Sequence, residues 1–133
     1  MDISTSLVVV GNLTNDPDLR ETGSGVPVIN FTIAANPRRF NKDTKEWEDS
    51  DPVFQRCTLF GAAAKNVADS VTKGMRVIAV GELRAENWVD NEGIKRTDKV
   101  LYVSEVAVSL KFSPARVSRG ERATSQTPSY DEF

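Results

Sequence analysis

The chain has 133 residues, of which 39% are hydrophobic, and this length and composition suit one small domain with an extension. It has no histidine and a single cysteine, Cys57, which excludes an internal disulfide and a thiolate zinc site within one chain, so we expect no metal or other cofactor. The formal net charge is −2 at pH 7, so any binding of nucleic acid must use a local basic patch rather than the overall charge.

The first half of the chain alternates as β-strands do. We expect strands over residues 3–13 and 26–36, separated by turn-forming residues around Asn15 and around Gly23. Residues 37–52 are polar and poor in aliphatic side chains, which indicates a long hairpin loop. A third strand is expected over Val53–Phe60.

The second half begins with helical spacing. Ala64, Val67, Ala68 and Val71 recur at i, i+3, i+4 and i+7, and Lys73 with Gly74 should end the helix. A fourth strand is expected over 75–89, a hairpin tip over 90–93 and a fifth strand over 96–110. On that last strand, one face is expected to carry Val100, Tyr102, Val106, Val108 and Leu110.

The order of these elements predicts an all-β protein, a five-stranded OB-fold Greek-key barrel with one helix between strands three and four. Another small five-stranded barrel remains an alternative, and the fold does not fix the function. From about Ser113 the chain is rich in Ser, Thr, Arg and Pro. Residues 1–112 are therefore expected to form the domain and residues 113–133 a disordered tail.

Exposed aromatic side chains beside arginines are the candidate functional residues. On the third strand Phe54, Arg56 and Phe60 should share one face, and a face that mixes Phe with Arg suits base stacking and phosphate binding better than a core. Trp88, on the same face as Arg84, is a further candidate. Packing of Phe60 inside the barrel is the alternative for that residue.

Charge is unevenly distributed in the long loop. Arg38, Arg39, Lys42 and Lys45 oppose one acid in its first half, whereas its second half is acidic. We therefore expect a basic patch around Arg38, Arg39 and Phe40, with Lys73 and Arg96 adding positive charge elsewhere. Trp47, among the acids, could instead pack against a neighbouring subunit. For any single lysine, solvated surface is the ordinary interpretation.

The sequence carries none of the motifs of nucleotide-binding or hydrolytic enzymes that we sought, namely Walker, GxGxxG, HExxH, GxSxG and CxxC. The paired acids Asp49 and Asp51 lie in a polar loop, where solvated charge is expected. We therefore expect no enzyme. No apolar run is long enough to span a membrane, and no signal sequence precedes the first strand, so no contact with a membrane and a cytoplasmic location are expected.

Four segments resemble bacterial single-stranded DNA-binding proteins, in order, over roughly residues 3–112: Leu7–Arg20, Val26–Asn36, Phe54–Leu83 and Asn87–Gly93. The most specific motifs are VGNL-x-x-DP-x-LR and the block from LFG to GEL ahead of the tryptophan. SLKFSPARV, after the last strand, is similar to actinobacterial members. The resemblance implies an OB fold, a cytoplasmic, nucleoid-associated homotetramer, and ssDNA binding in replication, recombination and repair. It places base-stacking aromatics at Phe40, Phe54, Phe60 and Trp88, the first two often tryptophan in the family.

The tail departs from the family pattern. Members that recruit partners end in an acidic tip with Pro-Phe, whereas this tip has Asp131, then Glu132 in place of proline, then Phe133. Recruitment of replication and repair proteins through the tip is therefore left open, and the tail favours a specialised paralogue or a mobile-element copy. The alternatives to ssDNA binding are an OB-fold scaffold for protein contacts and an RNA-binding protein.

Overall fold

The computed structural model describes residues 6–36 and 38–118. In chain order its strands and helix are β1 (Ser6–Leu13), β2 (Asp18–Glu21), β3 (Pro27–Ala35), β4 (Arg38–Asn41), β5 (Glu46–Asp49), β6 (Val53–Phe60), α1 (Ala62–Ser70), β7 (Arg76–Val89) and β8 (Lys95–Val108).

The five long strands close into a barrel. They follow one another in the order β1, β7, β8, β6 and β3, and β3 pairs back to β1 through Asn12 with Ala34 and Leu13 with Ile33. β6 and β8 pair in parallel, whereas the other strand pairs of the described residues are antiparallel. This confirms the predicted five-stranded barrel with one helix between its third and fourth strands.

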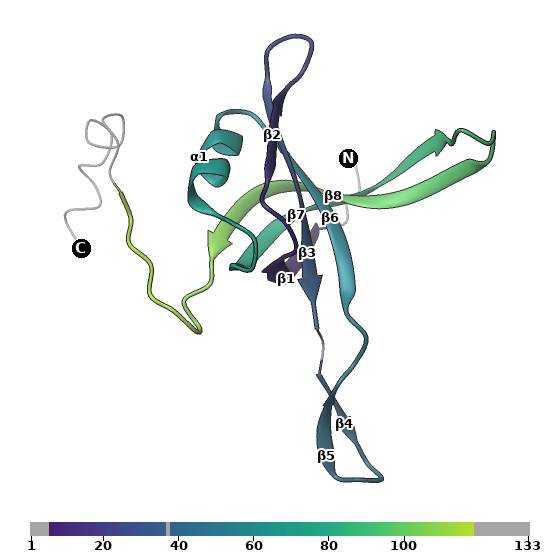
Figure 1. Ribbon diagram of the computed structural model, residues 1–133, viewed down its shortest axis with the longest axis vertical. Coiled ribbons are helices and arrows are strands. Elements are labelled where there is room, and N and C mark those ends of the chain that lie inside the picture. The colour runs from purple at the N-terminus through teal and green to yellow at the C-terminus, as the bar shows by residue number, and fades with distance from the viewer. Residues whose placement is uncertain (1–5, 37, 119–133) are drawn as a thin grey trace.

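The core fills the inside of this barrel. Ile29, Phe31 and Ile33 alternate inward along β3, as their spacing predicts, and meet Leu101 of β8. Full burial of an aliphatic side chain of this size contributes about 1.5–3 kcal/mol. α1 packs against β2, β3 and β6 through its buried Ala64, beside the barrel (Figure 1). This helix is too short and too polar to cross a membrane.

Hairpins project from the barrel in several directions. The loop expected over residues 37–52 is a two-stranded ribbon, β4 with β5, which extends away from the barrel (Figure 1). The outer halves of β7 and β8 form a second arm. The short strand β2, which pairs with β3, was not predicted, because all four of its residues are exposed and give no alternation of apolar and polar side chains.

The helix is shorter than predicted. It ends at Ser70, and Val71 is already extended, with φ −120° and ψ 145°, while its side chain enters the core. Beyond it, contacts with the β1–β2 region replace helical hydrogen bonds: the Lys73 N–H donates to Asp16 Oδ1 (2.8 Å) and the Gly74 N–H to the Leu13 carbonyl (2.9 Å). Gly74 therefore serves a turn, with φ 90°, rather than the end of the helix.

Because of a β-bulge, the prediction that Tyr102 shares one face of the last strand with Val106 and Val108 is wrong. Val80 pairs with Glu105 but Gly81 pairs with Val103, so Ser104 is an extra residue. Val103, before the bulge, lies in the core, and Val106, after it, packs against the core, whereas Tyr102 lines an outer groove. Tyr102 thus does not share a face with Val106 and Val108, because one added residue reverses the side-chain alternation.

Candidate nucleic-acid interface

A groove runs over the outside of the barrel where β3, β6 and β8 lie side by side. Thr58 of β6 pairs with Asn30 of β3 on one side and with Tyr102 of β8 on the other. The groove has a volume of about 430 Å³, and its floor includes the buried side chains of Thr58 and Val100. Its size falls within the usual range of small-ligand sites.

Two aromatic side chains of β6 are exposed, and one of them lines this groove. Phe60, 49% exposed, is part of its lining, and Phe54, 63% exposed, lies six residues earlier on the same strand. Cys57 and Leu59 point into the core, so the strand alternates as the sequence predicts. The alternative that Phe60 packs inside the barrel is therefore wrong. Burial raises the pKa of the Cys57 thiol to about 12, which leaves it unreactive.

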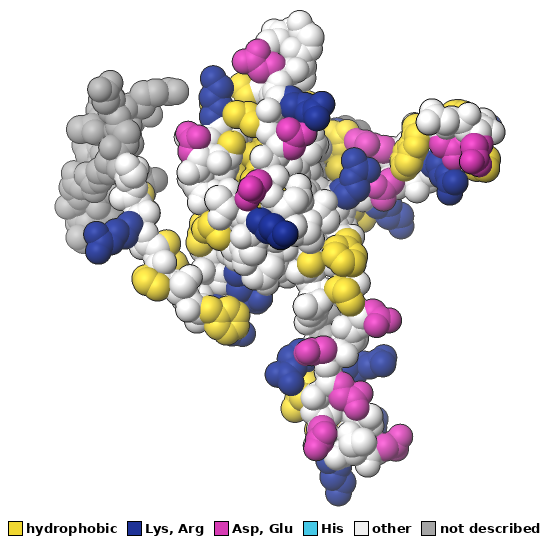
Figure 2. All heavy atoms as spheres, in the orientation of Figure 1, with side chains coloured by type: hydrophobic (Ala, Val, Ile, Leu, Met, Phe, Trp, Pro, Cys, Tyr) yellow, Lys and Arg dark blue, Asp and Glu magenta, His cyan; other side chains and the backbone are white. Residues whose placement is uncertain are grey.

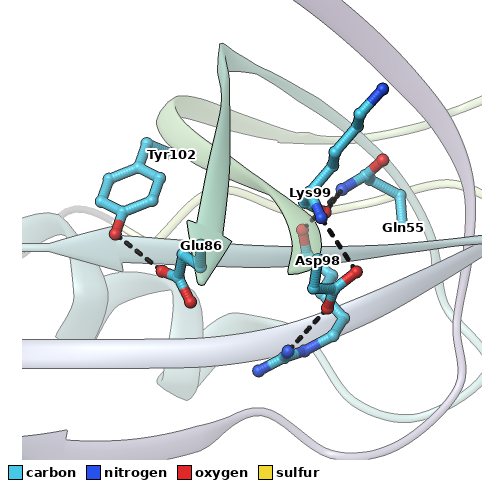
Figure 3. A network of polar contacts seen from close by, with 6 residues as sticks. Gln55, Glu86, Asp98, Lys99 and Tyr102 are labelled. Atoms are coloured by element: carbon cyan, nitrogen blue, oxygen red, sulfur yellow. Dashed lines mark hydrogen bonds and ion pairs between the residues drawn. The ribbon is translucent and has the colours of Figure 1, made fainter. Parts of the chain in front are cut away.

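The expected phosphate-binding arginines are already paired with carboxylates. Arg56 Nη1 lies 2.7 Å from Asp98 Oδ2, and this hydrogen bond lowers the pKa of Asp98 (Figure 3). Arg84 Nε lies 3.4 Å from a Glu82 carboxylate oxygen. Such exposed pairs contribute only about 0.2–1 kcal/mol each, so a phosphate can replace the carboxylate at little cost.

Tyr102 is a groove residue that sequence reasoning did not place at the site. Its hydroxyl donates to Glu86 Oε1 (2.7 Å), which raises the pKa of Tyr102 (Figure 3). Its ring stacks beside Phe60, with centroids 6.2 Å apart, and the Arg84 guanidinium carbon lies 4.5 Å from its centroid. The sequence held no signal for this placement, since only the bulge at Ser104 shows which way Tyr102 points.

Trp88 lies outside the groove, on the β7–β8 arm. It is 46% exposed and pairs across the arm with Arg96, beside a second hollow of about 380 Å³. Arg96 Nε donates to Asp90 Oδ2 (2.9 Å), and the Asp90 pKa is lowered chiefly by the backbone N–H of Ile94 and then by Arg96. Lys73, in the loop between α1 and β7, lines neither hollow.

The β4–β5 ribbon is not the basic patch that its sequence predicts. Arg38 lies opposite Asp49, with Nε 3.3 Å from Oδ1, and Arg39 lies opposite Glu48. Pairing of the two strands brings the basic half of the segment against the acidic half, and Figure 2 shows both signs interspersed along this arm. An aromatic pair remains: the Phe40 and Trp47 rings meet edge to face, with centroids 5.5 Å apart.

The structure thus places the predicted site residues at several separate positions, with Phe54 on β6 outside the groove lining and Lys73 in the loop after α1. Arg56, Phe60 and Arg84 come together around Tyr102 at the groove, Phe40 lies on the β4–β5 ribbon and Trp88 on the β7–β8 arm. The tail tip, Asp131, Glu132 and Phe133, lies outside the described residues. Across residues 6–36 and 38–118, no cluster of three or more His, Cys, Asp or Glu side chains could hold a metal ion.

Comparisons with known proteins agree on one family. A family model described as "Single-strand binding protein family" matches residues 4–109. The chain is 47% identical over 122 residues to the single-stranded DNA-binding protein of Paenarthrobacter nicotinovorans, covering 92% of this chain and 72% of that protein. It is 44% identical over 119 residues to the protein of that name from Mycobacterium tuberculosis (strain ATCC 25618 / H37Rv), covering 90% and 73%.

A solved structure shares the fold. The crystal structure of the small single-stranded DNA-binding protein from Streptomyces coelicolor superposes with a TM-score of 0.69 at 23% identity, over 80% of this chain and 95% of that one. This likeness supports the OB-type barrel predicted from the order of the elements.

Proposed function

Since the chain belongs to the single-strand binding protein family, we propose that it binds single-stranded DNA without sequence preference and protects it during replication, recombination and repair, with no catalysis of its own. The observation that carries this proposal is the pair of exposed rings, Phe54 and Phe60, that flank Arg56 on β6, of which Arg56 and Phe60 line the groove. Rings of this kind accept the face of any base, whereas an arginine between them is placed to meet the backbone.

Binding of this kind works by exchange of partners. A base that stacks on a ring contributes roughly 1–3 kcal/mol, and every base offers a π-face, so the contact does not depend on sequence. Each arginine exchanges its carboxylate for a phosphate, and the released carboxylate, which is exposed, is left to solvent. The two arms, with Phe40 and Trp88 at a distance from the groove, would lengthen the path along which a strand is held.

The proposal includes self-assembly. β1 bears Val8, 60% exposed, and Val10, 36% exposed, on its outer face. Exposed apolar side chains on a strand favour contact with another protein surface. We propose that copies of the chain associate into a homotetramer through such surfaces, in the cytoplasm at the nucleoid, with residues 1–112 as the binding domain. Sedimentation velocity would distinguish the tetramer from a monomer.

Titration with oligo-dT tests the function directly. Because Trp88 lies on an exposed arm, stacked bases should quench the intrinsic fluorescence that it shares with Trp47. The dependence of log K on log salt should have a slope of about −0.7 for each phosphate contact. An absence of salt-sensitive affinity for oligo-dT would contradict the proposal. Tighter binding of a matched oligo-U would favour an RNA-binding protein, and no binding of either would favour a protein scaffold.

Removing the carboxylate that holds Arg56 should strengthen binding. In Asp98→Asn, the Arg56 guanidinium loses its charged partner and becomes free for a phosphate. From the value of an exposed ion pair, we expect roughly a twofold to fivefold lower Kd for oligo-dT at low salt. Asp69→Asn, on the exposed surface of α1, changes the net charge equally and is the control. Equal gains in both variants would show that only overall charge matters.

A further inference from the structure

The groove between β3, β6 and β8 contains a tyrosine that its sequence pattern does not mark as a binding residue. Tyr102 is half-buried, and its ring faces the opening that Phe60 also borders. The two ring planes are inclined by only 30°, with centroids 6.2 Å apart, so one base can contact both rings. From this geometry we propose that the groove is a subsite for a single nucleotide and that Tyr102 is the residue on which its base stacks. This inference rests on the proposed function.

The tyrosine ring is held in place before any ligand arrives. Its hydroxyl donates to Glu86 Oε1 across the β7–β8 pair at 2.7 Å. A side chain whose orientation is fixed in advance loses little conformational freedom on binding, so more of the stacking energy is retained. Glu86 is therefore a positioning residue: it anchors the hydroxyl end of the ring and fixes the orientation of the ring face.

The guanidinium group of Arg84 already lies over the Tyr102 ring. The Arg84 guanidinium lies over it at 4.5 Å, and the other partner of Arg84, Glu82, is at 3.4 Å. A cation over an exposed ring is held less firmly than a stacked base. A nucleotide can therefore displace the guanidinium from the ring, and Arg84 then becomes available to the phosphate of that same nucleotide.

The charges around the groove fix how the nucleotide enters. Asp18 and Glu86 are both part of the lining. Asp18 is paired with Arg20 (2.7 Å), so the Glu86 carboxylate is the charge that chiefly repels a phosphate from the interior. Uncharged donors and acceptors line the β3 side of the groove at Asn30 and Thr32, where they can meet the edge of a base. The base therefore faces inward, and the phosphate stays outside near Arg56 and Arg84, which flank Val100 on the two neighbouring strands.

Substitution of Tyr102 separates stacking from structure. Tyr102→Leu should raise the Kd for oligo-dT roughly 5- to 150-fold, whereas Tyr102→Phe, which keeps the ring and loses only the hydrogen bond to Glu86, should raise it less than about fivefold. Phe112→Leu is the matched control, because Phe112 is an exposed aromatic residue beyond the end of β8 and outside the groove. Thermal unfolding of each variant shows whether the barrel is retained.

Photo-crosslinking distinguishes a tyrosine that contacts the base from one that only stabilises the fold. Oligo-dT carrying 5-iodouracil should crosslink to wild-type protein at Tyr102 or Phe60, as located by mass spectrometry of the digested adduct. If the crosslinks map elsewhere and Tyr102→Leu, still folded, binds as wild type does, the subsite is overturned while the proposed function stands. If wild-type protein does not bind oligo-dT, the proposed function itself fails.

Discussion

Replacing both Phe54 and Phe60 with alanine should raise the Kd for oligo-dT at least about 30-fold. The rings are six residues apart on β6, about 20 Å along an extended strand, so they contact different bases. Each lost stack costs at least about 1 kcal/mol, and contributions at this separation add, which gives about 2 kcal/mol or more. Fluorescence quenching measures the loss, since Trp47 and Trp88 both remain.

Val53→Ala is the control for that double variant. Val53 adjoins Phe54 on the same strand, is 55% exposed and points to the opposite face, so its loss should leave the affinity unchanged. Affinity of the double variant within threefold of wild type would contradict a stacking role for β6. Binding would then depend on the two arms rather than on the barrel.

Gly81→Ala should destabilise the barrel by about 3 kcal/mol. A Cβ at this position would overlap the carbonyl oxygen of Tyr102 and approach the Cα of Val103, both backbone atoms of the paired strand. A flexible side chain could move aside, but these atoms cannot move without breaking the β7–β8 ladder at the bulge. Urea unfolding followed by circular dichroism measures the change as a shift in the midpoint.

Gly23→Ala provides the comparison, because a Cβ at Gly23 meets no other atom within 4 Å. Its free energy of unfolding should change by less than about 0.5 kcal/mol. Equal midpoints for Gly81→Ala and wild type would mean that β7 and β8 can separate at the bulge. The outward orientation of Tyr102 would then not depend on the close backbone contact between Gly81 and Tyr102.

Local alternation predicted the parts of the fold where one strand face is buried. Ile29, Phe31 and Ile33 on β3 and Cys57 with Leu59 on β6 are core residues, as their spacing indicates. β2 escaped prediction because an all-exposed strand has no pattern to detect. The helix end was misplaced because it is set by contacts of Lys73 and Gly74 with residues 57 and 61 positions earlier, which no local window contains.

The sequence predicted only part of the candidate site, because local patterns do not show which strands lie side by side. Aromatic residues and arginines can be read from one strand, and Phe54, Arg56 and Phe60 do share an exposed face. The partners of those arginines come from other strands, so the carboxylate of Asp98 at Arg56 could not be foreseen. The same limit applied to the β4–β5 ribbon, where the basic segment and the acidic segment neutralise each other only once they pair.

The parallel pairing of β6 with β8 determines when the groove comes into being during folding. Arg56 pairs with Val100 and Thr58 with Tyr102, so each contact joins residues 44 positions apart. The β7–β8 hairpin can form early, because its strands are adjacent in the chain, whereas docking of β8 onto β6 must close a long loop first. The Trp88 arm therefore needs only the β7–β8 hairpin, whereas the capacity to hold a nucleotide in the groove requires the closed barrel.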